Sequence, residues 1–369
     1  MVRLRITART ADGARRARLL TAHGEVQTPA FMPVGTAATV KAVTPRQLVE
    51  AGTEIVLANT YHLHVGPGVK GIAALGGLHR FMAWEGPILT DSGGYQIFSL
   101  ASNVTISERG ARFRSHIDGS AIELTPEGVA KLQRDLGVDI AMAFDVLCGG
   151  KDERSTVAAA MGRTLRWAGR TRESPHTEVD RTFAIMQGGL FEDLRRECAE
   201  RLVELDFPGY AVGGLSVGEE KEATMRVAEF SVGLLPWEKP RYMMGMGTPP
   251  DLVRLCGWGY DLFDCVIPTR NGRNATLYSR GGKIAIRNAR FANDAEPVEE
   301  GCDCYTCRHF SRAYLNHLAR RKEILGSTLA TIHNVYFYQR LMADIRKAIE
   351  DDDYVNFSRE FMRRYKGDD

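Results

Sequence analysis

Short, continuous runs of apolar residues recur along the chain, and longer stretches with apolar residues at helical spacing lie between many of them. Continuous rather than alternating runs are typical of parallel strands that are buried on both faces. The eight predicted strands are Ala30–Val34, Glu54–Ala58, Pro87–Thr90, Asp139–Phe144, Thr182–Met186, Tyr210–Gly213, Arg241–Met244 and Asp261–Phe263. Eight strand-then-helix units predict an α/β fold of the (β/α)8 TIM-barrel type.

Several of the intervening stretches predict helices on the outside of the barrel. The first of them begins with Thr-Pro-Glu, a sequence that favours a helix N-terminus. The predicted helices include Thr125–Leu136, Glu153–Arg172, Phe191–Leu205 and Glu219–Leu235.

Two segments predict β-hairpins outside the barrel. At the start of the chain, Leu4–Thr7 alternates in polarity, Ala11–Gly13 predicts a turn, and Arg18–Thr21 predicts the returning strand. Later, Phe113–Thr125 alternates on both sides of an Asp118-Gly119 turn. We therefore expect an N-terminal β-hairpin and a second hairpin inserted between barrel units.

The stretch 280–334 also breaks the strand–helix pattern. It holds a cluster of cysteines and a predicted basic helix, Arg308–Leu325, and a last barrel helix is predicted at His333–Glu350. We expect a single catalytic barrel domain over residues 1–369, with 280–334 as a zinc-binding subdomain inserted before that last helix. The charged chain beyond Asp351 is expected to fray.

Composition narrows the class of protein only slightly. The chain is 44% hydrophobic and 25% charged, which is typical of a globular protein. The N-terminal sequence MVRLRITART lacks the apolar core of a secretion signal, and no apolar run reaches the length of a membrane span. We therefore expect a cytoplasmic protein. A net charge of +2 neither requires nor excludes an RNA partner.

Three of the seven cysteines, Cys302, Cys304 and Cys307, lie within six positions. Such a cluster is rare by chance, and in a reducing compartment it favours metal binding over three incidental buried thiols. With one histidine it would form a closed tetrahedral zinc site, and the zinc would be structural because no coordination position stays open. His333 is the favoured fourth ligand, and the alternatives are His309 and His317.

Polar residues and glycines follow most of the predicted strands. Because the carboxyl ends of barrel strands meet on one face, these residues should gather at one rim. They are Asn59, Asp91, Ser92, Tyr95, Asp145, Gln187, Gly214 and Asp264, with neighbouring glycines and the apolar Leu215. A single aspartate in such a place is more often a turn or cap residue, but three on one rim favour a site.

Two or three carboxylates suit the cleavage of an N-glycosidic bond. One can stabilise or capture the oxocarbenium-like sugar while another moves protons, and a base that replaces water in the second step makes the outcome an exchange. Arg270 and Arg273 follow Asp264 and could contact phosphates or base edges. Tyr95 could stack on a base or pack under its loop.

Five segments together resemble the bacterial tRNA-guanine transglycosylases. They are LTDSGGYQ (Leu89–Gln96), AVGGLSVGE (Ala211–Glu219), YMMGMG (Tyr242–Gly247), LFDCVIPTRNGRN (Leu262–Asn274) and CDCYTC (Cys302–Cys307). The resemblance runs from about Ala30 to the C-terminal helix. It implies a (β/α)8 barrel that exchanges the wobble guanine of tRNAs with G-U-N anticodons for a 7-deazaguanine base.

The resemblance also implies a role for each site residue. Asp264 would be the nucleophile that attacks the ribose, and Asp91 the general acid/base. Asp145, Gln187, Gly214 and the Leu215 backbone would bind the base, with Glu219 behind that peptide, Asn59 and Ser92 nearby, and Tyr95 and Met244 on its two faces. Arg270 and Arg273 would bind the anticodon loop of tRNA, and Cys302, Cys304, Cys307 and His333 would bind zinc. A homodimer is implied, through a surface near Phe310, Tyr314 and His317.

The chain departs from the family pattern at one position of interest. Bacterial members commonly read Asp-Glu-Cys where this chain has Asp145-Val146-Leu147, with Cys148 next. This position lines the pocket around the 7-substituent, so the incoming base is either 7-aminomethyl-7-deazaguanine, which we favour, or queuine. Ser216, which follows Leu215, is a second and weaker sign of the same departure from the family pattern.

Four other functions are compatible with parts of the sequence. An archaeal-type member would carry an added C-terminal RNA-binding region, and a non-catalytic partner subunit would not need both Asp91 and Asp264. A zinc-dependent RNA-binding module leaves the carboxylates at the rim without a use. A sugar hydrolase on the same barrel leaves the zinc subdomain and the pair Arg270 and Arg273 unexplained.

Overall fold

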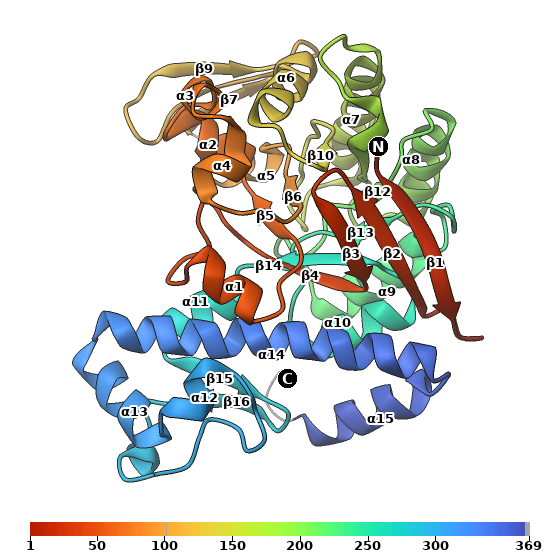
Figure 1. Ribbon diagram of the computed structural model, residues 1–369. Helices are drawn as coiled ribbons and strands as arrows, with labels where there is room; N and C mark the ends of the chain where they lie inside the picture. Colours follow the sequence, from red (N-terminus) through yellow and green to blue (C-terminus); the bar gives the residue numbers. More distant parts are fainter. Residues whose placement is uncertain (101, 366–369) are drawn as a thin grey trace.

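The computed structural model describes residues 1–100 and 102–365 and closes the predicted strands into a parallel barrel (Figure 1). The barrel strands are β4 (Ala30–Pro33), β5 (Val56–Ala58), β6 (Ile88–Thr90), β10 (Ala141–Met142), β11 (Thr182–Met186), β12 (Tyr210–Val212), β13 (Arg241–Met243) and β14 (Leu262–Cys265). All eight predicted strands are confirmed, with ends that differ by two residues or fewer.

Strand pairing runs once around the ring. Six strands form one sheet in the order β10-β11-β12-β13-β14-β4, and β5 pairs with β6. Two parallel bridges, Val34 to Leu57 and Leu89 to Ile140, connect the two sheets and close the barrel. The carboxyl ends of the eight strands therefore meet at one rim.

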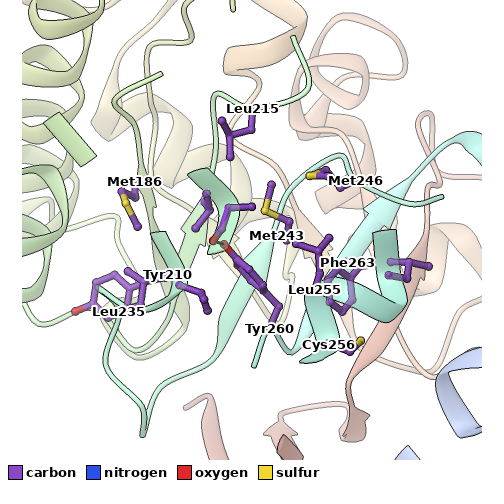
Figure 2. Close-up of a cluster of buried hydrophobic side chains, with 14 of the residues drawn as sticks. Met186, Tyr210, Leu215, Leu235, Met243, Met246, Leu255, Cys256, Tyr260 and Phe263 are labelled. Atoms are coloured by element: carbon purple, nitrogen blue, oxygen red, sulfur yellow. Dashed lines mark hydrogen bonds between the residues drawn. The ribbon is translucent and has the colours of Figure 1, made fainter. Parts of the chain in front are cut away.

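The barrel has an apolar interior and an apolar outer layer. Inward-facing residues such as Met32, Leu89 and Phe183 form one buried cluster. Outward-facing residues of β11 to β14 pack against the surrounding helices in a second, larger cluster (Figure 2). Burial on both faces explains why these strands are continuous apolar runs in the sequence.

The four predicted outer helices are confirmed. Thr125 caps the first of them, since its side chain accepts a hydrogen bond from the Gly128 N–H at 3.1 Å. The helices after the middle and later strands are α6 (Pro126–Leu136), α7 (Arg154–Glu173), α8 (Glu192–Glu204), α9 (Lys221–Val232), α10 (Pro249–Gly257) and α11 (Ile267–Arg273). The shorter helices are α1 (Pro45–Glu50), α2 (Thr60–Val65), α3 (Val69–Ala74), α4 (Gly77–Met82), α5 (Gly94–Leu100), η1 (Val179–Arg181) and η2 (Ala289–Phe291).

Both predicted hairpins are in fact three-stranded antiparallel sheets. The N-terminal sheet adds a third strand to the prediction, and so does the insertion. Their strands are β1 (Arg3–Arg9), β2 (Arg15–Thr21) and β3 (Gly24–Thr28), and β7 (Ser102–Ile106), β8 (Ala111–Arg114) and β9 (Ala121–Leu124). The third N-terminal strand has a weak sequence signal because Val26 is its one apolar residue.

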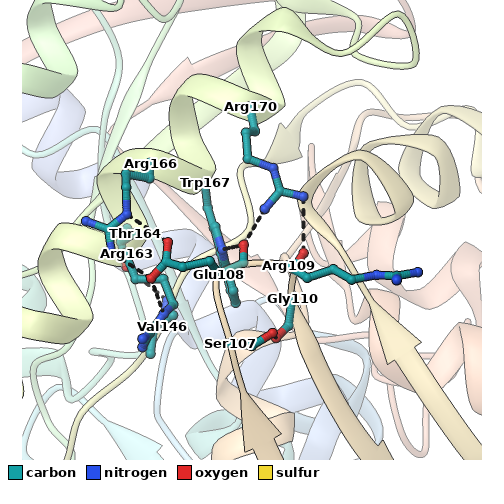
Figure 3. A network of polar contacts seen from close by, with 10 residues as sticks. All are labelled: Ser107, Glu108, Arg109, Gly110, Val146, Arg163, Thr164, Arg166, Trp167 and Arg170. Atoms are coloured by element: carbon teal, nitrogen blue, oxygen red, sulfur yellow. Dashed lines mark hydrogen bonds and ion pairs between the residues drawn. The ribbon is translucent and has the colours of Figure 1, made fainter.

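A polar network fastens the inserted sheet to α7 (Figure 3). Glu108, in the turn between β7 and β8, forms ion pairs with Arg163 and Arg166, which hold the pKa of its carboxyl at about 2. The Trp167 indole donates to the Glu108 carbonyl at 3.0 Å. The same helix also holds the segment after β10, because the Val146 N–H donates to the Thr164 hydroxyl at 3.0 Å.

The C-terminal part of the structure differs from two of the predictions. Its elements are β15 (Thr276–Ser279), β16 (Gly282–Ala285), α12 (Tyr305–His309), α13 (Arg312–Arg321), α14 (Ile324–Glu350) and α15 (Tyr354–Arg364). The predicted helix Arg308–Leu325 is broken, because Ser311 caps the start of α13 and Lys322 ends it in a left-handed conformation. The last barrel helix begins at Ile324 rather than at His333, and it lies between the barrel and the zinc-ligand elements (Figure 1).

The prediction that the chain frays beyond Asp351 is wrong for the described residues. Helix α15 packs on the barrel through Tyr354, which is buried and whose hydroxyl donates to the Val253 carbonyl. Phe357 and Phe361 extend that contact. The prediction therefore missed a charged helix that carries an apolar stripe on one face. Among the described residues, every helix is too short or too polar to cross a bilayer.

Candidate functional site

The rim at the carboxyl ends of the strands brings three carboxylates together. Asp91 directly follows β6, Asp145 follows β10 by three residues, and Asp264 lies in β14. Asp91 and Asp145 are buried and Asp264 is partly exposed. Burial in a region of low dielectric makes each charge costly unless hydrogen bonds stabilise it, so the partners of each carboxylate define what it can do.

Three donors hold Asp91. The amides of Asn59 and Gln96 donate to its Oδ2 at 2.6 and 2.8 Å, and the Thr60 N–H donates to its Oδ1 at 2.9 Å. Burial nevertheless raises the pKa of Asp91 to about 6, and the charge of Asp264 adds to that rise. A carboxyl group with a pKa near neutrality can both give and take a proton at physiological pH.

Asp264 has a different environment. Its Oδ1 accepts hydrogen bonds from the Tyr242 hydroxyl at 2.6 Å and from the Gly245 N–H at 2.8 Å. Among the described residues no donor contacts its Oδ2, so this oxygen keeps its lone pairs available. Burial raises the pKa of Asp264, while the two hydrogen bonds oppose that rise. The carboxylate is therefore fixed at one oxygen and free to react at the other.

Asp145 sits in a rigid polar frame. The Ser92 hydroxyl donates to its Oδ1 and the Gln187 amide to its Oδ2, both at 2.7 Å. Close packing requires glycine beside it, because a Cβ at Gly94 would approach Asp145 Oδ1 to 2.7 Å and one at Gly214 would collide with the Gln187 side chain. This frame explains two of the glycines that follow the strands.

The loop after β12 is shaped by Glu219. Its carboxylate accepts hydrogen bonds from the Ser216 N–H, from the Val217 N–H at 2.8 Å and from the Thr224 hydroxyl at 2.8 Å. Because a trans peptide directs its N–H and C=O to opposite sides, the Leu215 carbonyl points away from Glu219. The loop thus presents a backbone acceptor rather than a donor on that side.

The remaining predicted contacts lie at the same strand ends. Tyr95, in the first turn of α5, is 57% exposed and its ring is available to a planar ligand. Met244 follows β13 and is partly exposed. Arg270 is exposed and Arg273 is partly buried, both in the last turn of α11.

Sequence reasoning missed three residues that hold the carboxylates. Thr60 and Gln96 position Asp91, and Tyr242 positions Asp264. Thr60 and Gln96 stand next to predicted site residues, so their proximity along the chain was an available signal. Tyr242 lies inside a strand and looked like an ordinary apolar core residue, so its hydroxyl gave no signal.

The predicted zinc ligands form one cluster of the right chemistry. The four ligand atoms of Cys302, Cys304, Cys307 and His333 lie within 4.8 Å of one another. The three sulfurs lie 3.9, 3.5 and 3.4 Å from His333 Nδ1. His333 Nε2 donates to the Tyr278 carbonyl at 2.6 Å, which fixes the tautomer that turns the Nδ1 lone pair toward the sulfurs. These residues fit a metal ion such as zinc, and the alternatives His309 and His317 are not in the cluster.

A second group of possible metal ligands lies at the opposite end of the barrel. His23 and His79 stack at 3.6 Å and both contact Asp139, at 2.9 and 3.0 Å. Asp139 precedes β10 and also accepts the Ile88 N–H at 2.9 Å. With its oxygens already satisfied, and on the face that in barrels serves stability, this group is structural.

A closed parallel barrel with hydrogen-bonded carboxylates at its C-terminal rim is the arrangement of a barrel enzyme. The family model described as queuine tRNA-ribosyltransferase (TGT) matches residues 10–367. Proteins named queuine tRNA-ribosyltransferase are similar over nearly the whole length. Those of Caldanaerobacter subterraneus and Pelotomaculum thermopropionicum are each 52% identical over 96% of this chain, covering 95% and 96% of their own lengths. That of Dehalococcoides mccartyi is 51% identical over 96% of this chain and 90% of its own.

The chain therefore belongs to the queuine tRNA-ribosyltransferase family. It is an enzyme, a transferase of the pentosyl class. The family expected from the five sequence segments is confirmed, whereas the roles of the individual site residues remain predictions.

Replacement of one cluster cysteine tests the metal site. We expect Cys304→Ala to lose bound zinc and to lower the Tm by at least about 5 °C, because metal-binding energy is also folding energy. Metal analysis and thermal melting measure both. A chelator should lower the Tm of the wild type but not that of the variant.

The matched control is Cys256→Ala, which removes a buried thiol outside the cluster. It should lose packing energy and keep its zinc. A Cys304→Ala protein that retains zinc would exclude Cys304 as a ligand.

Proposed function

We propose that this enzyme is a tRNA-guanine transglycosylase that replaces the wobble guanine of tRNAs with G-U-N anticodons by a 7-deazaguanine base. The observation that carries the proposal is the pair Asp264 and Asp91 on one rim, one with a free oxygen and the other with a pKa of about 6. The first provides a nucleophile and the second a proton carrier. The names of the similar proteins support tRNA as the substrate.

The reaction is a double displacement. Asp264 Oδ2 attacks C1′ of the wobble ribose, a C1′–O bond forms, and the bond from C1′ to N9 of guanine breaks. The electron pair stays on the departing guanine, which takes a proton from Asp91. The incoming base then returns a proton to Asp91 as its own nitrogen attacks C1′, and the bond to Asp264 breaks. Two inversions retain the configuration at C1′.

Base recognition follows from the polar frame. Asp145, Gln187 and Gly214 would read the guanine edge, with Ser92 and Asn59 holding the neighbouring carboxylates. Tyr95 and Met244 would lie on the two faces of the base. The Leu215 carbonyl, turned away from Glu219, is an acceptor suited to a cationic aminomethyl group on the base. That acceptor favours 7-aminomethyl-7-deazaguanine over queuine.

The zinc cluster and the basic residues would serve RNA binding. Zinc at Cys302, Cys304, Cys307 and His333 would be structural, since four protein ligands complete a tetrahedron. Arg270 and Arg273 would contact the anticodon loop. The stacked rings of Phe310 and Tyr314, 5.4 Å apart, lie where a homodimer contact is proposed. Maturation of tRNA would place the reaction in the cytoplasm, and residues 1–369 would act as one catalytic domain carrying the 280–334 subdomain.

A base-exchange assay tests the proposed function. Transfer RNA labelled with guanine at the wobble position is mixed with enzyme and either 7-aminomethyl-7-deazaguanine or queuine. We expect release of label with the aminomethyl base, and weaker release with queuine. Preference for queuine would reverse the assignment of the incoming base and place the specificity at Val146-Leu147. No release with either base would contradict the proposed function and favour an RNA-binding or partner-subunit role.

The pH dependence of the exchange tests the role of Tyr242. Its hydroxyl stabilises the charged form of Asp264, so Tyr242→Phe should raise the pKa of Asp264. The acid limb of kcat/KM should then move to higher pH by about one unit, since a hydrogen bond to a charged group contributes roughly 1.5 kcal/mol. Activity in the variant is thus lost earlier as the pH falls.

The control for this variant is Tyr210→Phe, on the neighbouring strand. Among the described residues the Tyr210 hydroxyl makes no hydrogen bond to Asp264, whose partners are Tyr242 and Gly245, so its removal should leave the acid limb in place. An unchanged acid limb in Tyr242→Phe would show that Tyr242 does not set the protonation of the nucleophile.

A further inference from the structure

A cavity of about 210 Å³ lies where α11 ends and α14 begins. The β15–β16 hairpin and α13 complete its walls. Its inner wall includes Leu277 and Leu315, which belong to the buried core of the zinc-ligand subdomain. That volume is well below the roughly 300–1,000 Å³ of a site for a drug-sized ligand, so the cavity suits a smaller group.

The rim of the cavity carries an excess of positive charge. Arg273, Arg287 and Lys322 line it, against one carboxylate, that of Glu323. Among the described residues none of the three cations forms an ion pair, whereas other arginines, such as Arg166, Arg170 and Arg312, each pair with a carboxylate. The Arg273 Nη1 is buried, and no residue that the structure describes offers it a hydrogen-bond acceptor. A buried donor left without an acceptor is costly, which indicates that an acceptor comes from a ligand.

The start of α14 adds donors to the same rim. This helix has 27 residues, its N-cap residue Glu323 makes no side-chain capping bond, and its first turn contains no acidic residue. The backbone N–H groups at such an end and the helix dipole both favour an anion. Gly326 and Ser327 of this turn line the cavity.

We propose that this cavity binds a backbone phosphate of the RNA substrate, a few nucleotides from the reacting ribose. The rim offers guanidinium, ammonium and backbone N–H donors, which match phosphate oxygens and carry no information about base identity. Helix α11 follows Asp264 and spans about 10 Å, so Arg273 links the cavity to the reaction site. This inference rests on the proposed function, because it names a second contact for the same substrate.

One substitution can fill the proposed site with a negative charge. Ser327→Glu places a carboxylate in the first turn of α14 beside the three cations, where it should stabilise the fold and compete with phosphate. We expect its Tm to rise or stay level while its Kd for tRNA increases at least tenfold. The slope of log Kd against log salt concentration should fall by about one or more, as expected when a phosphate contact is lost.

The matched control is Thr328→Glu, the next residue, which is also partly exposed but does not line the cavity. It carries the same added charge and should leave the Kd within about threefold of the wild type, since its carboxylate lies outside the cavity. At saturating tRNA, kcat should be unchanged in both variants. Equal weakening of binding by the two variants, or none by Ser327→Glu, would overturn the proposal.

A second pair of variants keeps the test independent of folding in Ser327→Glu. Lys322→Gln removes a rim cation and Arg321→Gln removes its exposed neighbour outside the cavity. The first should raise the Kd severalfold and the second should not, whereas equal effects would indicate a diffuse charge contribution and contradict a defined site. If the wild type exchanges bases normally but the two variants bind tRNA equally well, only the proposed phosphate site is overturned. A wild type that does not bind tRNA overturns the proposed function as well.

Discussion

The cost of burying three carboxylates at one rim is the constraint on which the site depends. Each carboxylate loses hydration, and the loss is tolerated only because the neighbouring strand ends supply donors. Asp91 and Asp145 each receive donors on both oxygens, whereas Asp264 receives donors on one. The closed barrel makes this possible, since it brings residues distant in sequence to one ring of strand ends. The asymmetry in hydrogen bonding gives the three carboxylates different chemistry.

Helix α14 connects the zinc-ligand cluster to that rim. His333 belongs to the cluster, and the next residue, Asn334, donates to the carbonyls of Pro268 and Thr276 at 2.9 Å and accepts the Tyr278 N–H at 3.0 Å. Pro268 lies in the first turn of α11, the helix that carries Arg270 and Arg273. A metal bound at the cluster would therefore stabilise the placement of Arg270 and Arg273, although it is remote from the reacting atoms in the proposed mechanism.

The sequence predicted the barrel well because parallel strands buried on both faces give continuous apolar runs. It also predicted which residues follow the strands, and the fold then places those residues together. It could not predict partners that depend on side-chain direction, such as the hydroxyl of Tyr242 inside a strand. Nor did it reveal β3, where Val26 alone is apolar, or the start of α14 at Ile324, where neither a capping side chain nor an acidic first turn marks the boundary.

The most direct test of the account is to trap the covalent complex and locate the attachment. Enzyme and tRNA are incubated without an incoming base, denatured and digested, and the modified peptide is identified by mass spectrometry. We predict a ribose linked to Asp264 in the wild type and no adduct in Asp264→Asn. Asp91→Asn keeps its nucleophile, so any adduct that it forms should also be at Asp264. Attachment at Asp91 or Asp145, or an adduct that persists in Asp264→Asn, would contradict the account.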